Sequence, residues 1–105
     1  MATYIVMNNF TDQGIRNVKD TINRADAVRE AAKKYGITVK EIYWTLGSVD
    51  VVAIFDAPDE ASITAFSLSL GSAGNIRSQT LRAFTKEEMK GVLKKMAGSK
   101  VAVPA

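Results

Sequence analysis

Residues 38–55 read TVKEIYWTLGSVDVVAIF, and this segment has the pattern of two antiparallel strands. Its first half, from Thr38 to Leu46, alternates apolar and polar side chains, and its second half, Val51–Phe55, is continuously apolar. Gly47 lies in the short connection between the halves, where glycine permits a tight turn. The segment therefore predicts a β-hairpin.

The segments on either side extend this hairpin to a β-α-β-β-α-β order. Residues 3–9 and 75–84 are rich in apolar and β-branched residues, as expected of strands. Residues 21–35 repeat apolar side chains every three or four positions, which predicts a helix, and a second helix is expected to begin at Pro58. The order is typical of the ferredoxin-like α+β fold, a four-stranded antiparallel sheet with helices on one face.

A further helix is expected at the C-terminal end of this unit. Residues 85–88, Thr-Lys-Glu-Glu, form a capping box that starts a helix. Its apolar side chains follow at helical spacing: Met89, Val92, Leu93 and Met96. We expect residues 1–97 to form one domain and residues 98–105 to form a C-terminal tail.

The composition excludes several kinds of chemistry. The 105 residues include no cysteine and no histidine. Disulfides, thiol nucleophiles, Cys/His zinc sites and a histidine general base are therefore ruled out. The sequence also shows no cofactor motif, so we expect no cofactor and no metal, and we assign no catalytic residue.

The net charge of +3 comes from the C-terminal part of the chain. Residues 1–85 hold nine basic and nine acidic side chains, whereas residues 86–105 hold five and two. These lysines decorate the polar side of the last helix and the tail, which favours a solvated surface over a nucleic-acid site. No apolar run approaches the ~18 residues of a membrane span, and the N-terminus lacks a signal-peptide core. We therefore expect a cytoplasmic protein that binds neither nucleic acid nor membranes.

The second face of the predicted sheet is unusually apolar for a monomer. If helices cover one face, the other is expected to be polar. Val51–Phe55 is instead apolar on both sides, and so is most of the first strand. A partner sheet or the C-terminal helix must then cover this face. We favour a homodimer packed sheet to sheet, which can enclose a cavity.

Three segments of the chain carry a resemblance to a known family. TYIVMNNFTDQGIRNVKD (3–20), KEIYWTLGSVDVVAIFDAPDEAS (40–62) and GNIRSQTLRAFTKEEM (74–89) resemble the GYD domain proteins, small and functionally uncharacterised proteins of bacteria and archaea. The resemblance implies the dimeric α/β-barrel architecture, a ferredoxin-like fold that associates through its sheet.

The family is named for a Gly-Tyr-Asp motif, from which this chain departs at one position. Gly47 and Asp50 match the motif, but Val49 stands at the tyrosine position. Two interpretations of the motif stay open. It either shapes the hairpin, with the aspartate capping backbone amides beside the turn, or it contributes to a binding site.

Several polar residues on the predicted strands are candidates for ligand binding. Glu41, Tyr43 and Thr45 share one face of their strand, and Arg77 shares a face of the last strand with Gln79. An arginine facing an enclosed pocket suits a carboxylate or a phosphate. The alternative is that these side chains form ion pairs or interface contacts.

Two further candidates are Asn8, near the end of the first strand, and Asp50. Asn8 either faces a cavity or closes a turn with the residues that follow it. The candidate ligand-binding residues are therefore Asn8, Glu41, Tyr43, Thr45, Asp50, Arg77 and Gln79.

These observations favour a non-catalytic, homo-oligomeric module that binds a small polar or anionic molecule or that forms an assembly. The alternative is a small cofactor-independent enzyme, an isomerase or oxygenase, with a pocket between sheet faces and Glu41 as its base. A regulator acting on nucleic acid would need an additional DNA-binding segment. The expected partners are a second copy of the chain and a small molecule.

Overall fold

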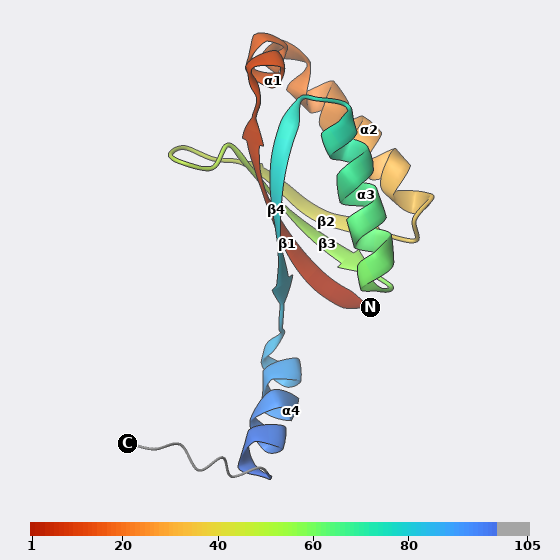
Figure 1. Cartoon of the computed structure of the whole chain (residues 1–105), viewed down its shortest axis with the longest axis vertical. Coiled ribbons are helices and arrows are strands. Elements are labelled where there is room, and N and C mark those ends of the chain that lie inside the picture. The colour runs from red at the N-terminus through yellow and green to blue at the C-terminus, as the bar shows by residue number, and fades with distance from the viewer. Residues whose placement is uncertain (99–105) are drawn as a thin grey trace.

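The computed structural model describes residues 1–98 and has the predicted ferredoxin-like α+β fold (Figure 1). The four strands form one antiparallel sheet in the order β2-β3-β1-β4, and α2 and α3 lie on the same side of it. The elements are β1 (Ala2–Phe10), α1 (Asp12–Arg16), a short 3-10 helix (Val18–Asp20), α2 (Thr21–Lys33), β2 (Thr38–Trp44), β3 (Val51–Ala57), α3 (Glu60–Ser72), β4 (Ile76–Ala83) and α4 (Lys86–Ala97).

The register of the strands decides which side chains share a face. Ile5 of β1 lies opposite Ile54 of β3 and opposite Leu81 of β4. Because side chains alternate along a strand, these three point to the same side of the sheet. A β-bulge between Val39 and Glu41 shifts the pairing of β2, so that Glu41 lies opposite Ile54.

The core lies between the sheet and the helices, with large aromatic side chains at its centre. The Phe66 ring of α3 lies 5.2 Å from the Tyr35 ring and 5.8 Å from the Phe55 ring, centroid to centroid. The fully packed apolar side chains are Tyr4, Val6, Ala32, Ile37, Ala53, Phe55, Ala57, Ile63 and Phe66. Burial of this face against α2 and α3 is the main source of stability for the fold.

The start of α3 differs from the prediction. Ala57 still pairs with Ala2 in the sheet, so Pro58 connects β3 to the helix instead of opening it. Asp59 is the N-cap, and its Oδ1 accepts a hydrogen bond of 2.7 Å from the backbone N–H of Ser62. The helix therefore begins at Glu60, two residues later than expected.

The last helix stands apart from the rest of the molecule, beyond the end of β4 (Figure 1). None of the residues Lys86–Ala97 is buried. The radius of gyration is 16.8 Å, against about 13 Å for a compact domain of this length. Within one chain, α4 thus does not cover the second face of the sheet.

The described residues end at Gly98, so nearly all of the predicted tail, residues 98–105, lies outside them. Across residues 1–98, no helix combines the length and the apolar character that crossing a membrane requires.

Candidate functional site

The side of the sheet that faces away from α2 and α3, here called the open face, has an apolar centre. Its central side chains come from β1, β3 and β4: Ile5, Met7, Val52, Ile54 and Leu81. They are partly exposed, and Leu81 retains 39% of its accessible surface. A contiguous apolar surface of this kind is typical of an interface rather than of a monomer surface.

The predicted polar residues surround this apolar centre on its two edges. Glu41 and Tyr43 lie on the open face of β2, and Tyr43 is 53% exposed. Arg77 and Gln79 lie on the open face of β4. Since β3 and β1 separate these edge strands, the two pairs are about 14 Å apart at the usual strand spacing. A single chain therefore does not bring them together into one site.

The candidate residues of the β2–β3 hairpin form hydrogen bonds that stabilise the connection between these strands. Asp50 Oδ2 accepts a hydrogen bond of 2.9 Å from the backbone N–H of Phe10, and the Asp50 N–H donates to the Asn8 carbonyl at 3.0 Å. The Thr45 N–H donates to the Asp50 carbonyl at 2.8 Å. Gly47 has φ of 106°, in the region that favours glycine. These contacts tie the hairpin to the end of β1.

Asn8 points away from the other candidate residues, into the helix-covered side of the sheet. It is 7% exposed, and the strand continues past it to Phe10. Its Oδ1 accepts a hydrogen bond of 2.6 Å from Ser78 Oγ. Its Nδ2 lies 3.5 Å from two backbone carbonyls, those of Val6 and Val51, which is the long limit for a hydrogen bond.

Asn8 lines a cavity of about 280 Å³ between α2, α3 and the sheet, here called the helix-side cavity. The aromatic residues in its wall are Phe10, Trp44 and Phe55. Much of the remaining wall consists of small side chains: Ala25, Ala27, Ala31, Ala53 and Ala73. Because the alanine side chain is a single methyl group, these residues leave the space between the helices and the sheet unfilled. The polar residues in the wall are Asn8, Thr21, Arg24 and Asn75.

Sequence reasoning missed the helix-side cavity and the place of Arg24 in it. The helical pattern of residues 21–35 assigned no role to Arg24. The sequence feature that could have indicated this cavity is the repeated use of alanine on the helix side that faces the sheet. Larger apolar side chains at those positions would fill the core more completely.

Two carboxyl groups have clearly lowered pKa values, and both lie at helix N-termini. The Ser62 backbone N–H lowers the pKa of Asp59 at the start of α3. The Thr85 backbone N–H, and then the Arg82 guanidinium, lower the pKa of Glu88 at the start of α4. These two carboxylates therefore cap the N-termini of α3 and α4. Nowhere in residues 1–98 do three or more acidic side chains gather as metal ligands.

Comparison with known proteins identifies related sequences over nearly the whole chain. The profile of the GYD domain family matches residues 4–93. A protein of Thermus thermophilus, named glutamine synthetase and cystathionine beta-lyase binding protein, is 30% identical over 95 residues. That alignment covers 90% of this chain and 100% of the relative. The family match includes nearly all of β1, the other three strands, α2 and α3, and most of α4.

Proposed function

The chain belongs to the GYD domain family, and on that basis we propose that it is a non-catalytic binding protein that works as a homodimer, with the open faces of two copies packed together. The observation that carries this proposal is the apolar centre of the open face. Burying one large aliphatic side chain contributes about 1.5–3 kcal/mol, and several such side chains lie together here. A second copy supplies a matching apolar surface by symmetry.

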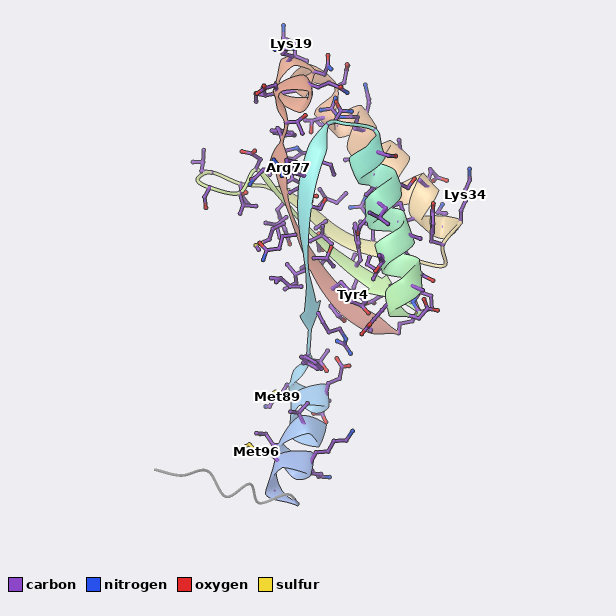
Figure 2. The ribbon with its side chains drawn as sticks, in the orientation of Figure 1. Tyr4, Lys19, Lys34, Arg77, Met89 and Met96 are labelled. Carbon is purple, nitrogen blue, oxygen red and sulfur yellow. The ribbon has the colours of Figure 1, made fainter. Side chains whose placement is uncertain are left out.

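The position of α4 supports the same arrangement. Its apolar side chains are exposed: Met89, Val92, Leu93 and Met96. Figure 2 shows Met89 and Met96 projecting to the side opposite Tyr4, which lies under the helices. The apolar side of α4 thus continues the open face beyond the end of β4. In the proposed dimer it lies against the α2–β2 connection of the second copy, which is at the same end of the overlying β2.

Dimer formation also gives the polar candidate residues a common location. A two-fold axis parallel to the strands sets β2 of one copy over β4 of the other. Tyr43 and Gln79 lie at the same level along the strands, because both align with the Met7–Val52 pair. The proposed dimer therefore places Tyr43 of one copy over Gln79 of the other, next to Arg77, where a small anionic molecule meets a cation. Glu41 lies over Leu81, on the other side of Tyr43.

A protein-binding role is supported by the Thermus relative, whose name states that it binds two enzymes, glutamine synthetase and cystathionine beta-lyase. We extend that role to this chain and infer that its dimer binds an enzyme of the same kind. In such a dimer, α2 and α3 of both copies lie on the outside and remain accessible to a partner.

The proposed dimer is tested by placing a charge in the centre of the open face. We expect Ile54→Glu to weaken self-association about a hundredfold, because it buries an unpaired carboxylate in the interface. Thr64→Glu, on the exposed side of α3, introduces the same charge and is expected to leave self-association unchanged. Sedimentation equilibrium measures both constants. Equal self-association of the two variants would contradict the proposed interface.

The inferred partner is tested with purified glutamine synthetase and cystathionine beta-lyase from the organism that encodes this chain. We expect wild-type protein to bind at least one of these enzymes in isothermal titration calorimetry, with a stoichiometry of two chains per site. If neither enzyme binds, the partner inferred from the Thermus relative is wrong. The proposed dimer is not affected by that result.

A further inference from the structure

The helix-side cavity has a wall that suits the body of an apolar molecule. The aromatic core at one end of the sheet is filled by Tyr35, Phe55 and Phe66, whereas alanines line the other end between α2 and α3. The volume of about 280 Å³ is close to the lower limit of about 300 Å³ for small-molecule sites. The cavity is partly open to solvent, so a ligand has a path into it.

A cationic side chain, Arg24, lines this apolar wall and forms no ion pair within residues 1–98. Arg24 lies in the first part of α2, and its Nη1 donates a hydrogen bond of 2.8 Å to the Asn17 carbonyl. Its Nη2 is buried and has no hydrogen-bond partner in residues 1–98. The ion pairs of the same residues do not include Arg24. A buried guanidinium nitrogen without an acceptor is costly, and a bound anion removes that cost.

Asn8 supplies a second donor to the same cavity. The bond from Ser78 Oγ to Asn8 Oδ1 fixes the orientation of the amide, so Nδ2 is its donor end. The two carbonyls near Nδ2 are both 3.5 Å away, too far for strong hydrogen bonds. This amide is more than nine-tenths buried, so a closer acceptor at Nδ2 is favourable.

We propose that the helix-side cavity binds a small apolar monocarboxylic acid. Its carboxylate pairs with the Arg24 guanidinium, whose covered Nη2 turns toward the cavity to reach this acceptor, and accepts a hydrogen bond from Asn8 Nδ2. Its hydrocarbon or aromatic body lies among the alanines and beside Trp44. Each chain contains the whole site, on the side of the sheet opposite the open face. The site is therefore independent of the proposed dimer.

The single tryptophan of the chain provides the readout, since Trp44 lines the cavity. The probes are phenylbutyrate and phenylbutanol, which share a body and differ in the carboxylate. We expect phenylbutyrate to change the Trp44 fluorescence saturably, with one molecule per chain by calorimetry. Phenylbutanol is expected to bind at least tenfold more weakly, because it lacks the charge that pairs with arginine. Equal affinities, or no saturable binding of phenylbutyrate, would overturn the proposal.

Two variants test the placement of the ligand. Arg24→Gln is expected to weaken phenylbutyrate binding at least tenfold and to leave phenylbutanol binding unchanged. Arg16→Gln, at an exposed position of α1 outside the cavity wall, is expected to alter neither. Ala25→Leu fills the cavity and is expected to abolish binding of both probes while near-ultraviolet circular dichroism stays native. Unchanged phenylbutyrate affinity in a folded Arg24→Gln or Ala25→Leu protein would refute the site.

The proposed dimer and the proposed ligand site in the helix-side cavity are tested independently. The Ile54→Glu protein is expected to bind phenylbutyrate with wild-type affinity, since Ile54 lies on the open face. Loss of phenylbutyrate binding in that variant would contradict a site contained within one chain.

Discussion

Gly14 lies where α1 contacts the loop before β4, and the contact leaves no room for a side chain. A Cβ added at Gly14 would lie 1.9 Å from the carbonyl oxygen of Asn75. Thr11 fixes this approach, since its N–H donates to the same carbonyl at 3.1 Å and its hydroxyl donates to the Gly74 carbonyl. The close approach therefore requires glycine at this position.

We expect Gly14→Ala to lower the free energy of unfolding by about 1–3 kcal/mol, because the Asn75 backbone must move. Gly71→Ala is the matched control. Gly71 also lies in a helix, but an added Cβ meets nothing within 4 Å there, so alanine is expected to stabilise by about 0.5–1 kcal/mol. Urea unfolding measures both values. Changes of the same sign would contradict the packing described for Gly14.

For single residues, the sequence predicted local roles better than contacts with distant partners. For Gly47 and Asp50 the sequence left two roles open, in the hairpin or in a binding site. The positive φ of Gly47 agrees with the hairpin role, which turn chemistry predicts locally. The Asp50 carboxylate instead accepts from the Phe10 N–H, 40 residues away in the sequence. The requirement for Gly14 and the unpaired Nη2 of Arg24 depend on segments far apart in the sequence. No local pattern encodes such contacts.

The first turn of α4 makes the contacts that join this helix to β4. Thr85 and Glu88 form a capping box, and Arg82 Nη2 lies 2.9 Å from Glu88 Oε2. The Arg82 guanidinium also lies over the Phe84 ring, at 4.5 Å from its centroid. These contacts join α4 to β4 while leaving its apolar side exposed.

The lowered pKa of Glu88 predicts how α4 responds to acid. The Thr85 N–H and Arg82 favour the charged carboxylate, so its contribution to helix stability is present above the ordinary pKa of 4.5. That contribution is lost as the pH falls through the lowered pKa of the folded state. We expect far-ultraviolet circular dichroism to show a loss of helix below about pH 4.5.

A substitution isolates this transition. Glu88→Gln is expected to reduce the acid-induced loss of helix, because the titrating group is gone. Glu87→Gln changes an exposed neighbour that pairs with Lys90, and it is expected to leave the transition as in the wild type. An acid transition that is identical in the two variants would contradict the role assigned to Glu88.

The elements themselves were predictable because each carries a periodic pattern and a capping or turn signal. The capping box of α4 and the four strands were confirmed. The start of α3 was wrong by two residues, because pairing of Ala57 with Ala2 extends β3. The pattern of α4 identifies an apolar side but not the surface that covers it, so its separation from the sheet was not predictable.

For the whole molecule, the sequence indicated an apolar second face of the sheet, and the strand register defines that face. The candidate site was less predictable. Glu41 and Tyr43 lie on one edge strand and Arg77 on the other, whereas Asn8 faces the helices. Strand order is a tertiary property, so sequence spacing alone did not separate these residues. In the homodimer that we propose, two copies pack through their open faces, and the polar residues of β2 in one copy lie close to those of β4 in the other.

Intermolecular nuclear Overhauser effects between isotope-labelled and unlabelled copies of the chain test that arrangement most directly. We predict such effects from the methyl groups of Ile5, Ile54 and Leu81, which lie at the centre of the open face. We also predict them from Leu93 of α4, whose side chain is exposed in a single chain. Their absence from all four residues, together with the mass of a single chain at the concentration of the same sample, would contradict the proposed homodimer.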